Sequence, residues 1–265
     1  MTTNVPLDSS EGKERLAWCN GEHHAKSVIQ VWEQQSGRTL CGFQTLACII
    51  NSVEQTKKKD IELFGMVIQQ YPETGIKEST VLEEGLTMDE FIKVASVITA
   101  ASDITTSRVY VMHTPCCEEI GVNKDDARRA LITILTEEVH TRIACNYHMT
   151  TAGQEPYGGH FSPLVAFHED SDSFLILDVW PDTAPFWVKW DVLWLVLQRL
   201  LMETCCFRLL CSIYLLFITS IDIHTSSFQC LIFCSFSRRA MAHKDTKSGK
   251  CRGFVCLKWE NGFTG

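Results

Sequence analysis

Residues 35–47 read QSGRTLCGFQTLA and place a cysteine, Cys41, shortly after a glycine-containing turn. The apolar run over residues 46–53 predicts a helix that begins near this cysteine. Free backbone N–H groups and the dipole at a helix N-terminus stabilise a thiolate. Gln35, six residues earlier, is placed to donate a side-chain N–H to an oxyanion beside the sulfur. The stretch predicts either a cysteine nucleophile with half of an oxyanion hole or a core cysteine on a helix.

Three strands are expected in the second half of the chain, over residues 143–148, 160–167 and 174–180. A polar turn joins the last two strands into an antiparallel hairpin, with His160 opening one strand and Asp178 closing the other. The hairpin therefore brings the histidine and the carboxylate to the same end. A histidine oriented by a carboxylate and facing a cysteine gives the Cys-His-Asp form of nucleophilic catalysis. Each residue alone is compatible with a structural role, but the combination favours catalysis.

Composition places the 265-residue chain among ordinary globular proteins, with 45% hydrophobic and 21% charged residues. A net charge of −8 without a basic stripe argues against nucleic-acid binding. Residues 1–6 are polar and lack the apolar core of a signal peptide, which favours a cytoplasmic location. In a reducing compartment the 13 cysteines indicate reactivity, metal binding or burial rather than disulfides.

The remaining periodic segments predict a mainly helical first half. Cys19, His23 and His24 lie within the first of these segments and allow two interpretations, a metal site or a solvated helix face. The solvated face is favoured because adjacent histidines on a helix point in different directions. Helices are expected over residues 11–33, over 61–70, from a capping box at Thr87 and Glu90, and over 124–138, with a strand over 109–112.

Several short motifs resemble the catalytic domain of phytochelatin synthase. They are Gln35 followed by Cys41-Gly42, the pair Tyr147-His148, GHFSP at 159–163, LILDV at 175–179 and PFWV at 185–188. The resemblance covers roughly residues 10–200 and resumes near residue 241, where KDTKSGKCRGF occupies residues 244–254.

The resemblance implies an α+β, papain-like fold with two lobes. An N-terminal helical lobe would carry Cys41, and an antiparallel β lobe would carry His160 and Asp178. It also implies that Cys41 attacks the Cys–Gly amide of glutathione and passes γ-Glu-Cys to a second glutathione. The products would be metal-chelating peptides that serve heavy-metal detoxification, and Gln35 would stabilise the oxyanion.

The predicted substrate-binding residues are Gly42, Gly159 and Phe161, and no residue is assigned as a metal ligand. No organic cofactor is expected. Cadmium, zinc or copper ions would act as activators or as glutathione thiolate complexes. The expected partners are glutathione and its metal thiolates, with no nucleic acid. Membrane association is not assigned, and a homodimer is possible.

Two departures from the family pattern bear on the substrate site. Phe43 and Gln44 follow Cys41-Gly42 where small residues are usual, and this bulk could narrow the acyl pocket. The sequence WPD at 180–182 replaces Ala-Arg-Phe and removes a cation that could recognise substrate carboxylates. Three alternatives therefore stay open: a hydrolase of glutathione or its S-conjugates, a weakly active thiol-rich metal-binding protein, and a protein-cleaving peptidase with a long groove.

An apolar, cysteine-rich segment interrupts the resemblance. Its most apolar run, residues 209–221, has 13 residues, which is short of the roughly 20 that span a bilayer as a helix. A membrane-lying insertion, extra buried elements, a cysteine metal cluster and translated non-coding sequence all remain open, although CxxC spacing is missing. The expected division is a mobile lead over residues 1–10, a catalytic domain over 11–202, an insertion over 203–238 and the end of the catalytic domain over 239–265.

Overall fold

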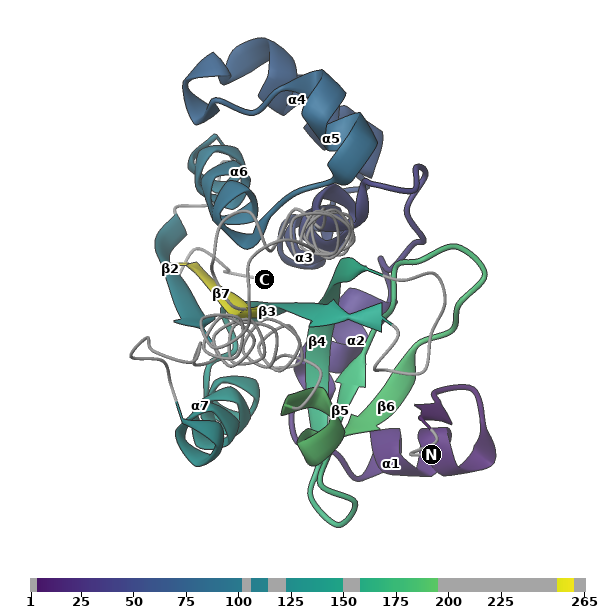
Figure 1. Cartoon of the computed structure of the whole chain (residues 1–265). Helices are drawn as coiled ribbons and strands as arrows, with labels where there is room; N and C mark the ends of the chain where they lie inside the picture. Colours follow the sequence, from purple (N-terminus) through teal and green to yellow (C-terminus); the bar gives the residue numbers. More distant parts are fainter. Residues whose placement is uncertain (1–3, 102–105, 114–122, 150–157, 195–251, 260–265) are drawn as a thin grey trace, which may run out of the picture.

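The computed structural model describes residues 4–101, 106–113, 123–149, 158–194 and 252–259. These residues form an α+β structure in which helices pack against an antiparallel sheet (Figure 1). The helices are α1 (Ser10–Ala17), α2 (Glu22–Ile29), α3 (Cys41–Glu54), α4 (Asp60–Gln70), the 3₁₀ turn η1 (Pro72–Thr74), α5 (Glu78–Glu84), α6 (Met88–Ala100) and α7 (Lys124–Glu137). The strands are β1 (Val5–Pro6), β2 (Thr106–His113), β3 (Thr141–His148), β4 (Gly159–His168), β5 (Ser173–Ile176), β6 (Phe186–Lys189) and β7 (Gly253–Trp259).

The described strands form one sheet in the order β1-β6-β5-β4-β3-β7-β2, and every neighbouring pair is antiparallel. The expected hairpin is confirmed, because β4 pairs with β5 and His168 lies opposite Ser173. Pro163 lies within the interior strand β4, beside a register shift between Leu164 and Ala166. An irregularity at this point is typical of a strand that contains a proline, which lacks an N–H for the ladder.

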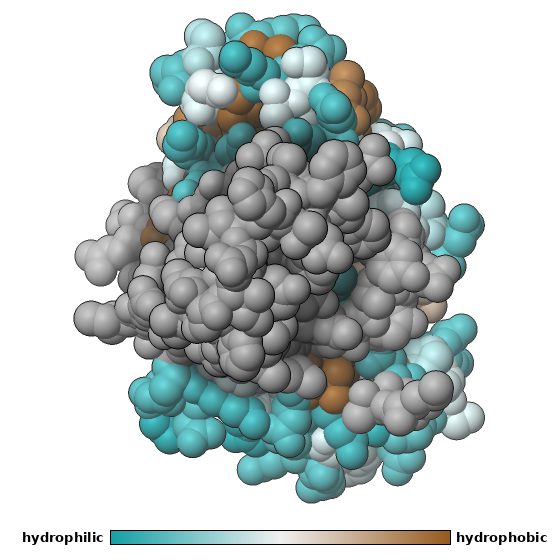
Figure 2. Space-filling view, viewed as in Figure 1, coloured by the Kyte–Doolittle hydropathy of each residue, from teal (hydrophilic) through white to brown (hydrophobic). Residues whose placement is uncertain are grey.

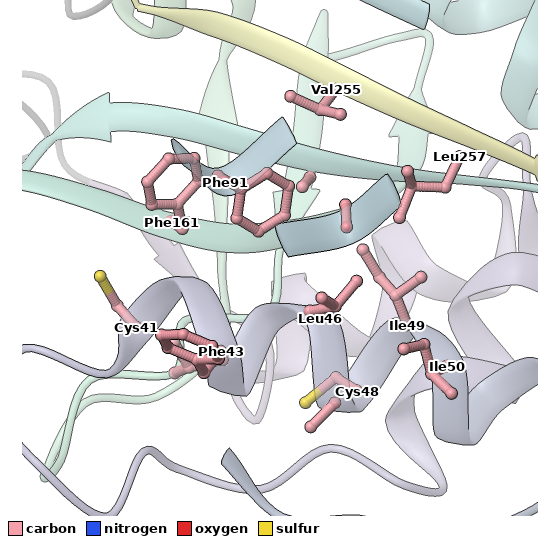
Figure 3. Close-up of a cluster of buried hydrophobic side chains, with 14 of the residues drawn as sticks. Cys41, Phe43, Leu46, Cys48, Ile49, Ile50, Phe91, Phe161, Val255 and Leu257 are labelled. Carbon is pink, nitrogen blue, oxygen red and sulfur yellow. The ribbon is translucent and has the colours of Figure 1, made fainter. Parts of the chain in front are cut away.

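Two hydrophobic clusters cover opposite faces of the sheet. One joins the sheet to α2, α3, α4 and α6, and the other includes the apolar side of α7. Consecutive residues of β3 belong to different clusters: Ala144 is in the first and Cys145 in the second. This follows because successive side chains of a strand point to opposite faces of the sheet. Helix α3 is buried at every position from Cys41 to Val53, and its side chains reach into the first cluster (Figure 3). Its polar residues Gln44, Asn51 and Ser52 are buried as well, and each forms a hydrogen bond.

Most of the expected helices are confirmed with small changes at their ends. The segment predicted over 61–70 is α4, and the segment predicted over 124–138 is α7. The capping box of α6 is present, since the Thr87 side chain accepts from the Glu90 N–H and the Glu90 carboxylate accepts from the Thr87 N–H. Asn123 caps α7 by accepting from the N–H of Asp126.

Part of the predicted N-terminal lead pairs with the sheet. Val5 pairs with Trp187 on β6, and the Leu7 N–H donates to the Pro185 carbonyl at 2.8 Å. This short strand lies close to α1, where a Cβ at Gly12 would lie 2.0 Å from the Pro6 carbonyl oxygen. The partners of Val5 and Leu7 lie far along the chain, so local composition does not reveal this pairing.

The C-terminal strand β7 lies inside the sheet, between β3 and β2. Its residues pair along both edges, with Val255 opposite Ala144 on β3 and opposite Val111 on β2. The predicted insertion over 203–238 falls outside the described residues. Among the helices that are described, none combines the length and apolar character needed to span a bilayer.

The described surface in the view of Figure 2 is mostly hydrophilic, with scattered hydrophobic residues. Four large hydrophobic side chains are strongly exposed, and they belong to four different parts of the chain: Trp18 after α1, Ile61 on α4, Leu82 on α5 and Val139 after α7. Single exposed hydrophobic residues of this kind are normal on soluble domains.

Candidate active site

Cys41 is the first residue of α3, as the sequence predicted. The hydrogen bond that closes the first turn runs from the Gln44 N–H to the Leu40 carbonyl at 2.9 Å. The N–H groups of Cys41, Gly42 and Phe43 therefore precede the helical ladder and lie at the end of the helix that carries the sulfur. These N–H groups and the helix dipole favour negative charge at this position, whether on a thiolate or on an oxyanion.

The other described cysteines lie in settings that keep them protonated. Burial raises the pKa of the Cys19 and Cys48 thiols to about 11, and that of Cys256 to about 12. Burial also raises the pKa of Cys145 well above its usual range. Cys41 differs from all four because a histidine lies within hydrogen-bonding reach of its sulfur.

His160 connects the cysteine to an acid, and its Nε2 donates to Asp178 Oδ1 at 2.8 Å. Both side chains are buried, with 1% and 0% of their surface exposed. Because Asp178 engages Nε2, Nδ1 is the ring nitrogen left to face Cys41. The structure thus brings together the three residues that the sequence placed in the catalytic group.

The environment of His160 favours the protonated ring. Burial alone would lower its pKa, but the hydrogen bonds to Asp178 and Cys41 outweigh this effect and raise the pKa from 6.5 to about 9. The imidazole therefore carries a proton at neutral pH. A protonated imidazole beside a cysteine sulfur favours the thiolate, which is the nucleophilic form.

The segment after β5 positions Asp178. The backbone N–H of Trp180 donates to the same Oδ1 atom at 2.9 Å, and the indole N–H of Trp32 donates to the backbone carbonyl of Asp178 at 3.1 Å. Strand β5 ends at Ile176, two residues before the acid and earlier than predicted. Asp178 thus lies in the loop after β5, where its carboxylate accepts the Trp180 backbone N–H and the N–H of the histidine ring.

Two aromatic rings flank the His160 imidazole at steep angles. The Tyr147 ring lies 5.5 Å away with an interplanar angle of 86°, and the Trp180 ring lies 5.9 Å away at 77°. Tyr147 comes from β3, where it pairs directly with His160. The sequence did not predict either contact, although the position of Trp180 two residues after the acid offered a signal.

Gln35 is buried beside the turn that carries Asp178. Its backbone N–H donates to the Val179 carbonyl at 2.7 Å, and its Nε2 donates to the Gly37 carbonyl at 2.7 Å. A glutamine amide nitrogen carries two hydrogens, so one hydrogen of Nε2 remains for another acceptor. Within the described residues, Gln35 Oε1 is buried without a hydrogen-bond partner.

The predicted substrate-binding residues differ in their surroundings. Gly42 is buried against α6, where an added Cβ would lie 3.0 Å from Leu86. Gly159 is half-buried at the start of β4. The preceding Gly158 has a φ of 148°, a backbone conformation that would be strained for a residue with a side chain. Phe161 is only 1% exposed, and its ring stacks on Phe91 at 4.6 Å (Figure 3). This burial places the Phe161 ring in the core, because side chains alternate along a strand and His160 takes the adjacent position.

The two bulky residues after Cys41-Gly42 point to other parts of the core. Phe43 packs edge-on against Phe64 of α4 at 5.3 Å, and Figure 3 shows its ring and the Cys41 sulfur on different sides of α3. Gln44 donates to the Glu33 carbonyl at 3.0 Å. Both side chains are thus used in packing α3 against α4 and the preceding loop.

The histidines of α2 do not share one environment. His23 is exposed, as expected for a solvated face, whereas His24 is buried with its Nδ1 3.2 Å from Arg142 Nη1. Burial and the nearby Arg142 lower the pKa of His24 to about 2, so the ring is neutral. Among the described residues, no group of three or more His, Cys, Asp or Glu side chains is arranged to hold a metal ion.

Comparison with known proteins identifies one family. The phytochelatin synthase family matches residues 1–205, which include α3, the β4–β5 hairpin and the turn with Asp178. A search of the curated proteins gives no match. The family match covers well over half of the 265 residues and contains Cys41, His160 and Asp178. The chain belongs to the phytochelatin synthase family.

Proposed function

We propose that this chain is a γ-glutamylcysteinyl transferase that acts on glutathione through a papain-like Cys-His-Asp mechanism. Membership of the phytochelatin synthase family implies an acyltransferase. The observation that carries the finer proposal is the connected group at the start of α3, in which Cys41 contacts His160 and His160 contacts Asp178 at 2.8 Å. Such a group is suited to forming and breaking a thioester.

In the first half of the reaction, the Cys41 thiolate attacks the carbonyl carbon of the Cys–Gly amide. The proton on His160 passes to the amide nitrogen as the C–N bond breaks, and glycine leaves. The γ-Glu-Cys unit remains on Cys41 as a thioester. The raised pKa of His160, about 9, supports this role because the ring is protonated when the thiolate attacks.

In the second half, the amino group of another glutathione attacks the thioester carbonyl. His160, now neutral, accepts a proton from this amine, and the thiolate of Cys41 leaves. The product is a glutathione extended by one γ-Glu-Cys unit. Water as the acceptor would give γ-Glu-Cys instead, which is hydrolysis.

Each tetrahedral intermediate places a negative oxygen near the start of α3. We assign its stabilisation to the Gln35 amide and to backbone N–H groups at the helix terminus. The remaining Nε2 hydrogen of Gln35 and the N–H of Cys41 are the donors that this assignment uses. Gly42 and Gly159 are proposed to line the substrate site.

The proposed substrates are glutathione and its thiolate complexes with cadmium, zinc or copper, and the proposed location is the cytoplasm. Thiolate complexes suit this chemistry because the metal occupies the substrate's own sulfur and leaves its amide free to react. The products would chelate heavy metals through their repeated thiolates.

A second candidate is hydrolysis of glutathione or its S-conjugates. The observation that favours it is Trp180, a half-buried aromatic side chain beside His160 where the family pattern has no aromatic residue. An indole ring at this position can contact an apolar substituent on the substrate sulfur, and it offers no charge to a second glutathione.

Mass spectrometry of products tests the proposal. The purified chain is incubated with millimolar glutathione, with and without cadmium, beside the variants Cys41→Ser and Cys48→Ser. We expect ladders that grow by γ-Glu-Cys units, lost in Cys41→Ser and retained in Cys48→Ser, which alters a neutral thiol of the same helix. γ-Glu-Cys and glycine without ladders would establish the hydrolase, and no product from a folded chain would contradict both functions.

A further inference from the structure

Asp60 is a buried carboxylate whose hydrogen bonds converge on the residue beside Gln35. It is the first residue of α4 and is only 2% exposed. Oδ2 accepts the backbone N–H of Ser36 at 2.7 Å, and Oδ1 accepts the Ser36 hydroxyl at 2.8 Å. Oδ1 also accepts the N–H of Ile61 at 2.7 Å. Each carboxylate oxygen thus accepts one backbone N–H. One comes from Ser36, 24 residues earlier in the sequence, and the other from Ile61, the next residue.

A buried carboxylate is costly unless its charge is compensated. No ion pair with Asp60 is found among the described residues, so its compensation there comes from these donors and from the N-terminus of α4. The carboxylate holds the Ser36 backbone through two hydrogen bonds at once, which fixes its direction. A neutral or shorter side chain would not satisfy the same set of donors.

The loop that carries Gln35 is held from a second side as well. The Gln35 N–H donates to the Val179 carbonyl at 2.7 Å, next to the catalytic acid, while Ser36 is held by Asp60 of α4. Two consecutive residues are therefore held by different parts of the fold. Gln35 is bound by the segment after β5, and Ser36 is bound by the first residue of α4. The orientation of the Gln35 side chain follows from these two anchored backbone positions.

We propose that Asp60 is a positioning residue for the oxyanion-binding amide of Gln35. This inference rests on the proposed function, because it requires a tetrahedral oxyanion beside Cys41. Asp60 does not touch the substrate in this account. It holds Ser36, and through Ser36 it sets where the remaining Nε2 hydrogen of Gln35 points.

Asp60→Asn is the sharpest variant because asparagine has the same shape and one acceptor oxygen. The backbone N–H groups of Ser36 and Ile61 then compete for that single oxygen, and one of them faces an amide NH₂. Asn51→Ala is the matched control. Asn51 is a buried polar residue of α3 that holds the loop before α4, donating to the Lys58 carbonyl at 2.8 Å and accepting the Lys58 N–H at 2.9 Å.

The readout separates positioning of the oxyanion donor from a general loss of structure. Acyl transfer passes through an oxyanion, whereas alkylation of Cys41 by iodoacetamide displaces iodide from a tetrahedral carbon and forms none. We expect Asp60→Asn to lower kcat about tenfold, less than the roughly hundredfold loss on removing an oxyanion donor, with the Cys41 alkylation rate unchanged. Asn51→Ala should lower the Tm without lowering kcat.

A double-mutant cycle with Gln35→Ala tests whether Asp60 acts through Gln35. The tenfold effect of Asp60→Asn should disappear in the Gln35→Ala background. An undiminished effect there, a wild-type kcat in Asp60→Asn, or a parallel fall in alkylation would each overturn the inference. Should Asp60→Asn fail to fold, Ser36→Ala removes only the hydroxyl contact and is expected to show the same pattern with a smaller loss.

Amide hydrogen exchange keeps this inference separate from the proposed function. Asp60→Asn should accelerate exchange at the Ser36 amide, while Asn51→Ala should leave it unchanged, and neither result depends on turnover. Unchanged Ser36 exchange in Asp60→Asn overturns the inference even if the wild-type chain makes ladders. Absence of turnover in the wild-type chain contradicts the proposed function and, since no oxyanion then forms, the positioning role as well.

Discussion

At the scale of single residues, the His160 ring is held by contacts on several sides. Asp178 binds Nε2 at 2.8 Å, and the rings of Tyr147 and Trp180 meet the imidazole at steep angles. Trp180 contributes twice, because its backbone N–H binds Asp178 Oδ1 while its ring lies against His160. Its half-buried ring is positioned to keep water from the hydrogen bond between the histidine and the acid.

Replacing the Trp180 ring should weaken this hydrogen bond and slow the reaction. Trp180→Ala keeps the backbone N–H bond to Asp178 and removes only the ring, so we expect kcat to fall about tenfold as water competes for the pair. Trp180→Phe restores an aromatic ring and should recover most of the rate. Steady-state kinetics of both variants measure the effect, and equal kcat in Trp180→Ala and the wild type would exclude a shielding role.

The residues of the site differ in how far the sequence reveals them. Cys41, His160 and Asp178 could be predicted because a helix start and a hairpin are local features that fix where their side chains lie. The contact of Asp60 with Ser36 could not, since it joins residues 24 positions apart in sequence across a loop without a periodic pattern. Phe161 was assigned to the substrate from its place in a motif, but strand alternation turns its ring into the core.

At the scale of elements, α6 connects a local sequence signal to the site. Its capping box begins at Thr87, and one turn later Phe91 stacks on Phe161, the neighbour of His160 in β4. The cap thus fixes the start of the helix that supports the strand with His160. The same helix covers Gly42, where Leu86 and Phe91 leave no room for a Cβ without a shift.

Removing this cap should cost stability. Thr87→Ala deletes the side-chain oxygen that accepts the Glu90 N–H at 3.2 Å, and we expect the free energy of unfolding to fall by about 1 kcal/mol. Thr87→Ser keeps the acceptor and should stay close to the wild type. Urea unfolding of the three proteins measures the difference. A Thr87→Ala chain as stable as Thr87→Ser would show that the cap contributes nothing.

Long elements with strong periodicity were predictable, whereas short paired strands were not. Helices α4 and α7 follow directly from their apolar spacing and N-terminal signals. Strand β1 has only two residues, and β6 has four, so neither is long enough for a pattern to appear. Their conformation is decided by pairing with distant segments, which sequence periodicity does not record.

At the scale of the whole molecule, the two ends of the described chain complete one sheet. Strand β1 extends it beyond β6, and β7 joins β3 to β2. The chain also contains two buried histidines with opposite properties, His24 on α2 and His160 on β4. The pKa of His24 is lowered to about 2 by burial and Arg142, and that of His160 is raised to about 9 because its hydrogen bonds outweigh burial.

These shifts predict that stability falls as the pH drops below about 6.5. Below this pH the unfolded chain binds a proton at His24 that the folded chain does not, so stability falls by at most about 1.4 kcal/mol per pH unit.

Urea unfolding from pH 4.5 to 9 measures this dependence, with His24→Gln and His160→Gln as separate controls. His24→Gln should flatten the acid side, and His160→Gln should leave it unchanged. A wild-type profile that loses no stability below pH 6.5 would contradict the assignment of a neutral, buried His24 in the folded chain.

The central claim is that Cys41 forms a γ-glutamylcysteinyl thioester, and trapping that thioester tests it most directly. The chain is mixed with glutathione, quenched in acid and digested, and its peptides are examined by mass spectrometry. We expect the mass of γ-Glu-Cys less one water on the peptide with Cys41, released glycine in at least equal amount, and no such adduct in Cys41→Ser. An adduct on Cys48 or Cys145 instead, or released glycine from Cys41→Ser, would contradict the claim.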